Sequence, residues 1–470
     1  MMDERTEITS GLDADTGDDA ATGRDTRRTT GRDARRADGR DTRCGGPRRS
    51  IWRSADYGWW FAADTCGELS SSLSGFAMPQ LALAVTGSAS LSAVIESITF
   101  LVQSVANVPG GVLQDRYDRR RLMMLYGVVG AVLFSGVALL GWTGLLGWPA
   151  LATAAVLVGL RAGLFGNASN AMLRGLVDDE RLPEALSLNN GRDAVISLAG
   201  SPLSGLLMGL GRFVPMLASA LLGVVGALSS WRIRRYWRRA TPGTADGTAA
   251  PDVRPGWRDA FSGLAWSFRY SFQRRMTISS ILFNGAINAL LLITQLHVTQ
   301  LTGSPVLAAM VITIGSVGML LGAFAASPLM GQVRGGALCL VSYAGLVIGG
   351  FGVAFAPNIW AKGAFLFVGL LLLPASNAVT GGFTAMLVAP GNQGRMLSAQ
   401  RLCSLGSYAL MSAVGGVLMD WFGYTAAATV FACCLAVGAA VAMSITAIRT
   451  LPRPGEWSGH IKACGLHRWE

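Results

Sequence analysis

Apolar and polar residues alternate in long blocks along most of the chain. From Trp59 onward, apolar stretches are separated by short connectors that carry charged, polar or glycine residues. Each stretch is about 20 residues long, which is enough to cross the hydrocarbon core of a bilayer as an α-helix. The pattern predicts an all-α integral membrane protein with twelve transmembrane helices, at residues 59–85, 91–112, 122–142, 148–173, 188–210, 214–231, 278–298, 306–326, 337–356, 361–387, 397–419 and 424–448.

Two internal repeats divide these spans into two sets of six. VTGSASL at residues 85–91 returns as LTGSPVL at residues 301–307, and NASNA in the fourth span returns as PASNA in the tenth. Duplicated halves of this kind are a common transporter plan. We therefore expect two pseudo-symmetric six-helix bundles, at residues 56–232 and 276–450.

Polar segments flank and join the two bundles. Residues 1–55 combine Asp and Arg with Gly and Thr and lack the apolar core of a secretory signal, so we expect a disordered cytoplasmic tail. Residues 233–275 are predicted to be a cytoplasmic linker, with an amphipathic helix at the membrane surface over residues 257–270. Residues 451–470 are expected to be a second cytoplasmic tail.

Composition favours a membrane class, and charge sets the orientation. Hydrophobic residues make up 51% and charged residues 14% of the chain, against roughly 25% charged residues in an average soluble domain. The net charge is +11, and arginines such as Arg116, Arg121 and Arg181 cluster in every second connector. Because basic connectors stay in the cytoplasm, we expect a multi-pass protein of the bacterial inner membrane with both termini cytoplasmic. This distribution disfavours a nucleic-acid partner.

Enzymatic chemistry has no support in the sequence. The seven cysteines show no metal-ligand spacing, and most of them lie within apolar stretches. A P-loop motif and a catalytic constellation with plausible spacing are both missing. We therefore expect no enzyme activity, no cofactor and no metal, and we disfavour ATP-driven pumping by this chain alone.

The most specific motif is GGVLQDRYDRRRL at residues 110–122, at the cytoplasmic end of the second span. It resembles the signature loop of the major facilitator superfamily, although Asp118 stands where the general pattern has glycine. The wording DRYDRRR is similar to the branch of enterobactin exporters and macrolide-efflux-like proteins, and the likeness extends to residues 176–190 and 391–400. The resemblance covers residues 59–451 and implies a two-bundle carrier that works by alternating access.

The signature pattern falls on residues that the resemblance makes gate candidates: Gly111, Asp115, Arg116, Arg119 and Arg120. We expect the glycine to let two helices approach closely and Asp115 to face a helix N-terminus or an arginine between the halves. In the superfamily this loop stabilises the conformation closed toward the cytoplasm. The alternative is that its arginines only determine topology. At the repeat-related site, Gly331 replaces the aspartate.

Charged residues inside predicted spans are the proton-coupling candidates: Asp64, Glu68, Glu96 and Arg161. Asp64 and Glu68 are four residues apart and share one helical face. In superfamily members the first and fourth spans line the central cavity, so the resemblance implies that Glu68 and Arg161 form an ion pair that protonation breaks. The alternatives are a static buried pair, or an Asp64 side chain that reaches the cytoplasmic interface.

The fifth span contains AGSPLSG, which is similar to the glycine-proline signature of antiporter families. Gly200, Pro202 and Gly205 are hinge candidates because proline and glycine permit bending and close helix contact. Ser201 and Ser204 stand where the family favours glycine. Simple packing of small residues is the alternative reading.

Asparagines within the spans are candidates for the substrate cavity: Asn167, Asn170, Asn284, Asn288 and Asn377. Their amides offer both hydrogen-bond donors and acceptors to a ligand. Hydrogen bonds between helices are the alternative role.

Together these features predict a secondary active transporter, with proton-coupled export of a drug, siderophore or secondary metabolite favoured by the resemblance. An importer or facilitator of a small nutrient and a transport-inactive sensor or scaffold remain the alternatives. The expected partners are a small-molecule substrate, protons and the lipid bilayer, and the expected functional unit is a monomer.

Overall fold

The computed structural model describes residues 55–177, 181–234, 264–389 and 392–466. These residues belong to one unit, which covers residues 51–470. In this described part of the chain, the regular structure is helical and there is no β-strand. The predicted all-α fold is therefore confirmed. The expected N-terminal tail and most of the central linker lie outside the described residues.

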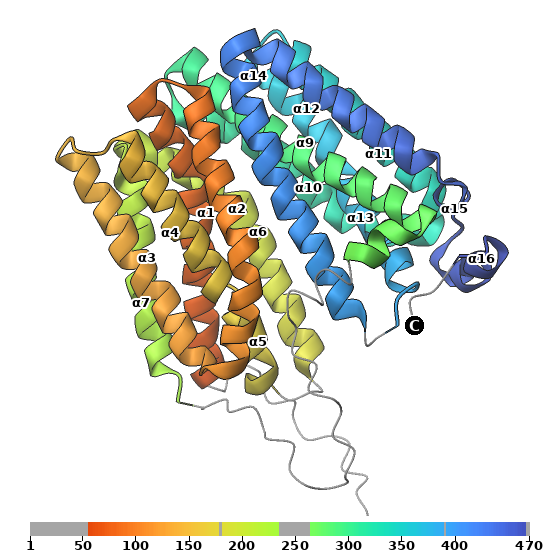
Figure 1. Ribbon diagram of the computed structural model, residues 1–470, viewed down its shortest axis with the longest axis horizontal. Helices are drawn as coiled ribbons and strands as arrows, with labels where there is room; N and C mark the ends of the chain where they lie inside the picture. Colours follow the sequence, from red (N-terminus) through yellow and green to blue (C-terminus); the bar gives the residue numbers. More distant parts are fainter. Residues whose placement is uncertain (1–54, 178–180, 235–263, 390–391, 467–470) are drawn as a thin grey trace, which may run out of the picture. The chain divides into compact units, whose positions relative to one another are not determined.

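Among its described residues the first half has seven α-helices, because its fourth span is broken. Figure 1 shows how these helices are arranged. They are α1 (Ala55–Thr86), α2 (Ala89–Arg116), α3 (Arg119–Trp142), α4 (Trp148–Phe165), α5 (Ala168–Leu176), α6 (Leu182–Leu210) and α7 (Val214–Arg232). α1 is long, with an acidic residue in its first turn and a run of serines at its midpoint.

The second half repeats this arrangement, including the broken fourth span. Its helices are α9 (Ser271–Thr302), α10 (Pro305–Gln332), α11 (Gly335–Phe355), α12 (Ile359–Leu371), α13 (Leu373–Ala385) and α14 (Gln393–Met443), followed by the short α15 (Thr446–Arg449), η4 (Pro454–Glu456) and α16 (Trp457–Ala463). Of the predicted amphipathic linker helix, residues 264–269 are described and helical.

Ten helical segments in the described chain are long and apolar enough to cross a membrane. One of them, Met396–Met443, covers two predicted spans because α14 continues through a kink at Gly423, where φ is 82°. The first predicted span falls on α1, which is not among the ten. Its composition explains this, because α1 carries Asp56, Asp64 and Glu68 together with its serines.

The repeat seen in the sequence has a structural basis in two equivalent turns. Gly87 between α1 and α2 has φ 69°, and Gly303 between α9 and α10 has φ 68°. Side chains with a Cβ rarely adopt this left-handed conformation, so the glycine of each TGS motif is required by the backbone. Ser88 then caps the N-terminus of α2 by accepting a hydrogen bond from the Leu91 amide.

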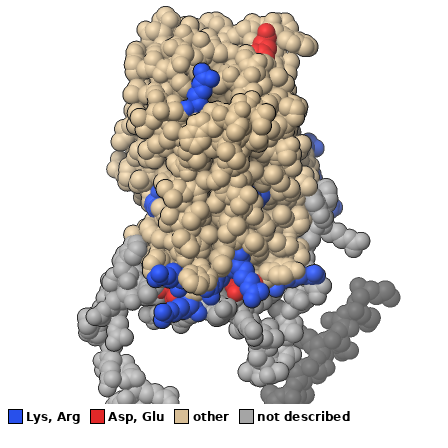
Figure 2. All heavy atoms as spheres, turned by 90° about the vertical axis from the view of Figure 1, so that its left-hand side faces the viewer, with Lys and Arg blue, Asp and Glu red and all other residues tan. Residues whose placement is uncertain are grey.

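The two ends of the helices differ in charge. Figure 2 shows Lys and Arg side chains gathered at one end of the face it presents, with few on the apolar surface between the ends. We call this end, where α2 ends and α3 begins at Arg116–Arg121, the basic end. The end with the Gly87 and Gly303 turns is called the opposite end. Large apolar side chains such as Leu210 and Phe324 are exposed on the helix surfaces, as expected where helices face hydrocarbon.

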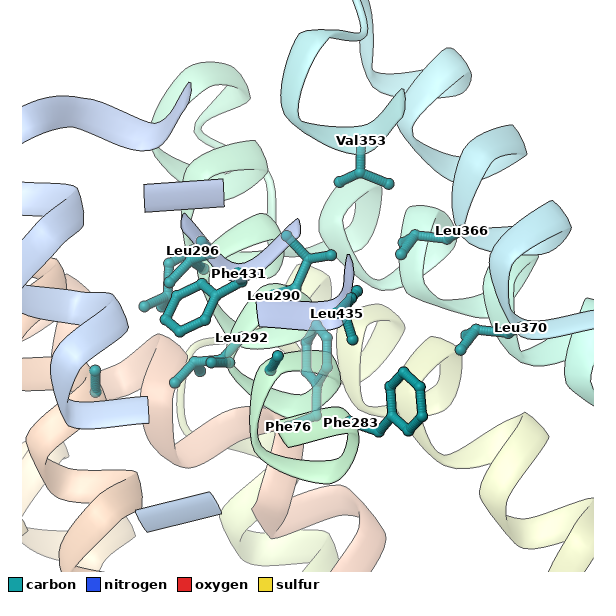
Figure 3. Packing of buried hydrophobic residues seen from close by; sticks show 14 of the residues in the cluster. Phe76, Phe283, Leu290, Leu292, Leu296, Val353, Leu366, Leu370, Phe431 and Leu435 are labelled. Atoms are coloured by element: carbon teal, nitrogen blue, oxygen red, sulfur yellow. The ribbon is translucent and has the colours of Figure 1, made fainter. Parts of the chain in front are cut away.

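The largest hydrophobic core contains residues of both halves. Phe76 of α1 belongs to the same cluster as Phe283 and Leu290 of α9 and Phe431 of α14, and Figure 3 shows these side chains. A hydrogen bond of 3.1 Å from Gln295 Nε2 to the Phe76 carbonyl also joins the halves. Asp64 and Glu68 precede Phe76 in α1 and therefore lie nearer the basic end than these contacts do.

Candidate functional site

A cavity of about 30 Å³ lies among α1, α3, α4, α5 and α7 in the first half. Its polar lining consists of Asp64, Glu68, Tyr126 and Arg161 together with two serines. Glu68 is an exposed side chain, whereas Asp64 and Arg161 are 9% and 2% exposed. The structure therefore brings three of the four predicted proton-coupling candidates to one place.

Arg161 is held by an aromatic ring and a backbone carbonyl. Its guanidinium carbon lies 3.7 Å from the centre of the Tyr126 ring, and Nε donates a hydrogen bond of 2.8 Å to the Tyr126 carbonyl oxygen. Its Nη2 is buried and has no hydrogen-bond partner among the described residues. A Cβ atom at Gly130 would lie 2.8 Å from the guanidinium, so this glycine makes room for the charge. Stacking of this kind stabilises a desolvated cation.

Glu68, the predicted acidic partner of Arg161, does not bind it directly. Glu68 and Arg161 line the same cavity, but these two described residues form no salt bridge with each other. Glu68 forms no ion pair with any other described residue, and the residue as a whole is exposed. Water can therefore reach it while the guanidinium beside it stays buried.

Asp64 binds a different arginine, which comes from α6. Arg192 Nη2 lies 2.5 Å from Asp64 Oδ2, and both side chains are under 10% exposed, at 7% and 9%. The same nitrogen lies 2.6 Å from Asp193 Oδ1. Asp64 is thus paired inside the helix bundle, and the alternative in which its side chain reaches the membrane interface is wrong for this structure. A buried charge is costly unless it is paired in this way.

Among the described residues, an arginine of the second half reaches this region. Arg401 of α14 donates a hydrogen bond of 3.0 Å from Nη1 to Asn167 Oδ1, at the break between α4 and α5. Glu68 is close enough to Arg401 for electrostatic interaction. The polar contact therefore crosses from one half to the other near the acidic residues of α1.

These ionisable side chains form one group, which we call the charge cluster. It consists of three carboxylates and three guanidinium groups, from Asp64, Glu68, Asp193, Arg161, Arg192 and Arg401. The cluster is neutral when every carboxyl group is ionised, and it carries one positive charge when one carboxyl group is protonated. Uptake of a single proton therefore changes the electrostatics of the whole site.

Sequence reasoning missed four members of this site. Arg192 and Asp193 lie in the fifth predicted span and Arg401 in the eleventh, so the signal was present, because an ionisable residue within a span indicates function. Tyr126 gave no signal, since one tyrosine in an apolar span is commonplace.

Comparison with known proteins agrees with this arrangement of helices. The sequence pattern described as Major Facilitator Superfamily matches residues 61–379, more than half of the chain. The chain belongs to the Major Facilitator Superfamily. It is a multi-pass membrane transporter and not an enzyme, and members of this superfamily bind small-molecule substrates within the membrane. No match was found among curated proteins.

Solved structures of superfamily transporters share the fold. A mutant of the nucleoside transporter NupG aligns with a TM-score of 0.66 at 12% identity, over 82% of this chain and 99% of that chain. A bacterial homologue of the iron transporter ferroportin, in an inward-facing state, has a TM-score of 0.64 at 14% identity, over 84% and 98%. A bacterial homologue of the lysosomal transporter Spinster, also inward-facing, has a TM-score of 0.60 at 12% identity, over 90% and 100%.

The signature loop of this transporter is anchored within the first half. Asp118 caps α3 by accepting a hydrogen bond of 3.0 Å from the Arg120 amide, which explains an aspartate where the superfamily has glycine. The Arg120 side chain donates to the carbonyl oxygens of Ser230 and Trp231 at the end of α7. Arg116 is exposed and Arg119 begins α3. The side chain of Asp115 lies outside the described set.

One expectation for this loop is wrong. In the described part of the chain, no atom lies within 4 Å of a Cβ placed on Gly111. A Cβ on the preceding residue, Gly110, would lie 2.2 Å from the carbonyl oxygen of Gly163 in α4. The close helix contact therefore belongs to Gly110, because the helical rotation of α2 turns this position toward α4.

The predicted hinge residues of α6 lie at two different interfaces. A Cβ on Gly200 would collide with Ser72 of α1 at 1.8 Å, within the first half. A Cβ on Gly205 would lie 2.4 Å from Ala309 Cβ of α10, in the second half. Pro202 lies inside the helix between them. Ser204, where the family favours glycine, donates a hydrogen bond of 2.9 Å to the Leu73 carbonyl oxygen.

The remaining candidates are dispersed. Glu96 lies in α2 outside the lining of the cavity, with Oε2 buried and unpartnered among the described residues. Asn284 and Asn288 of α9 donate hydrogen bonds to backbone carbonyl oxygens of their own helix. Asn284 also accepts a hydrogen bond of 3.3 Å from Tyr408 of α14. The side chains of Asn170 and Asn377 are exposed.

Proposed function

We propose that the chain is a proton-coupled exporter of a small organic compound that works by alternating access. The observation that carries the proposal is the charge cluster, in which an exposed Glu68 shares a cavity with a buried Arg161. Burying charged groups this deep in a helix bundle costs free energy, and such groups are retained where they have a function. The preference for export rests on the resemblance of the DRYDRRR loop to the enterobactin-exporter and macrolide-efflux branch.

The coupling follows from the charge balance of the cluster. With Glu68 ionised, the site is neutral and its carboxylate can accept hydrogen bonds or positive charge from a substrate. With Glu68 protonated, the cluster carries a net positive charge and loses that acceptor. Proton and substrate therefore compete for one carboxyl group, which is the requirement for exchange of one for the other.

Protonation of Glu68 affects the second half through Arg401. Arg401 reaches Asn167 in the first half and interacts electrostatically with Glu68. Protonation of Glu68 removes a negative charge near Arg401 and weakens the attraction between the halves on this side of the site. A ligand shifts a conformational equilibrium only by binding its states differently, and Arg401 supplies that difference for the proton.

The orientation proposed from the sequence places the basic end in the cytoplasm. The hydrogen bond between Gln295 and Phe76 and the Gly205 contact with Ala309 then join the halves on the outer side of the cluster. This arrangement fits a state open toward the cytoplasm, in agreement with the inward-facing states of two structural neighbours. Asp115 and Arg116 remain gate candidates for the opposite state.

Import is the rival function. One structural neighbour is a nucleoside transporter, although at 12% identity the likeness establishes the fold alone. A transport-inactive sensor is disfavoured by the intact charge cluster, whose burial costs stability without serving such a role.

The test uses membrane vesicles prepared from cells that contain the protein and from cells that lack it. An acidic lumen is imposed on inverted vesicles, and uptake of ethidium, erythromycin, enterobactin and uridine is followed. The proposal expects accumulation of at least one of the first three compounds, abolished by a protonophore. Uridine uptake only by right-side-out vesicles in acidic medium would establish import instead, and failure to move any compound in either preparation would overturn both.

A further inference from the structure

At the opposite end of the molecule, a carboxylate from the second half binds the first turn of a helix in the first half. Asp420 of α14 accepts hydrogen bonds at Oδ2 from Ser88 Oγ (2.7 Å), Ser90 N (2.9 Å) and Ser90 Oγ (2.6 Å). Its Oδ1 accepts a hydrogen bond of 3.1 Å from the Ala89 amide. Asp420 thus caps α2 from outside its own bundle. A carboxylate at this position is favoured by the unpaired amides and by the helix dipole.

The surrounding backbones are in close contact. Ser90 Oγ also lies 3.2 Å from the Gly416 carbonyl oxygen, one turn before Asp420. A Cβ on Gly416 would lie 2.4 Å from Ala93 Cβ and 2.8 Å from the Ala89 carbonyl oxygen. This glycine therefore allows α14 to lie directly against α2 where Asp420 reaches across.

The internal repeat relates the α2–α14 interface to the α6–α10 interface. Among the described residues, the α6–α10 interface has no carboxylate that caps a helix of the other half. Ser304 stands at the start of α10 as Ser88 stands at the start of α2, but its side chain makes no capping hydrogen bond. At the α6–α10 interface, Gly205 lies against Ala309 and Gly209 lies against Val306. The α2–α14 and α6–α10 interfaces between the halves therefore differ. Within the described residues, the capping carboxylate of Asp420 lies at the α2–α14 interface.

We propose that Asp420 is a positioning residue of the transport cycle, which holds the opposite end closed and must release the α2 N-terminus for that end to open. The inference rests on the proposed alternating-access function. Asp420 is exposed, so water can replace its hydrogen bonds when the halves separate. A contact of this kind can be broken and remade in every cycle, which a fully buried pair would hinder.

Asp420→Asn is the substitution that tests this contact most directly. The two carboxylate oxygens accept from four donors. In Asp420→Asn one oxygen is replaced by an amide nitrogen, which cannot accept and brings its own hydrogens toward the donors of α2. The side chain keeps its size, so packing of α14 is unchanged. Ser90→Ala removes the hydroxyl donor from the other side of the same contact.

The experiment measures accessibility in a cysteine-free background, which needs no substrate. A cysteine at Gln295, which is 9% exposed, reports opening of the opposite end, and one at Asn284 reports the basic end. Asp420→Asn and Ser90→Ala are each expected to raise labelling of the first cysteine several-fold from the outer side and to lower labelling of the second. Ser304→Ala is the matched control and is expected to leave both rates unchanged.

Opposite changes at the two ends distinguish a gate from a general loss of packing, which would raise labelling at both. Wild-type labelling of both cysteines in Asp420→Asn, with normal amounts of protein in the membrane, would overturn the inference. If labelling shifts as expected while the vesicles transport none of the tested compounds, the gate stands and the proposed function fails.

Discussion

Arg192 of α6 lies 2.5 Å from the carboxylate of Asp64 in α1, and this pair leaves Arg161 to its stacking contact with Tyr126. The two carboxylates on one face of α1 therefore differ in burial and in pairing. Asp64 is buried and neutralised by its arginine. Glu68 is exposed and makes no ion pair with a described residue, so it is the carboxyl group of this face that is free to exchange protons.

Asp64→Asn is predicted to destabilise the protein, because it removes one carboxylate from a buried guanidinium. Loss of one partner of a buried pair costs about 3–5 kcal/mol. The effect here is expected at or below the lower end of this range, since Asp193, with a side chain 45% exposed, still contacts Arg192. Thermal unfolding in detergent measures it. The double variant Asp64→Leu/Arg192→Met is expected to recover stability, and equal stability of Asp64→Asn and wild type would contradict a structural role for the pair.

Gly130→Ala is predicted to slow transport with little loss of stability. The added methyl group would lie 2.8 Å from the Arg161 guanidinium, which can move because it is the end of a flexible side chain. Overpacking of this kind costs about 1–3 kcal/mol in a rigid core, and the smaller value is expected here. Gly136→Ala on the same helix is the control, because no described atom lies within 4 Å of its Cβ position. Equal transport rates for the two variants would show that the position of Arg161 does not matter.

Gly205→Ala is predicted to favour opening of the opposite end. The Cβ of the introduced alanine would lie 2.4 Å from Ala309 Cβ, so α6 and α10 cannot pack as closely as they do here. Labelling of a cysteine at Gln295 is expected to rise. The compensating variant Gly205→Ala/Ala309→Gly removes the clash and is expected to restore wild-type labelling. Failure of this rescue would mean that Gly205 acts within α6 and not at the α6–α10 interface.

The sequence predicted those features that depend on local chemistry. Apolar block length gave the helices, and the TGS repeats marked the turns at Gly87 and Gly303. The Asp64/Glu68 spacing placed two carboxylates on one face. The partners of these charges were not predictable, because they depend on how each helix is rotated against its neighbours. Rotation brings Arg192 to Asp64, and it assigns close packing to Gly110 in place of Gly111.

Proton movement by purified protein in liposomes tests the role of Glu68 most directly. An outward gradient of the compound identified in vesicles is imposed, and lumenal pH is followed with a trapped pH-sensitive dye. Wild type is expected to acidify the lumen as the compound leaves, because protons enter in exchange. Glu68→Gln is expected to insert normally and to leave lumenal pH unchanged. Acidification by Glu68→Gln at the wild-type rate, or none by wild type during export, would contradict exchange at this carboxyl group.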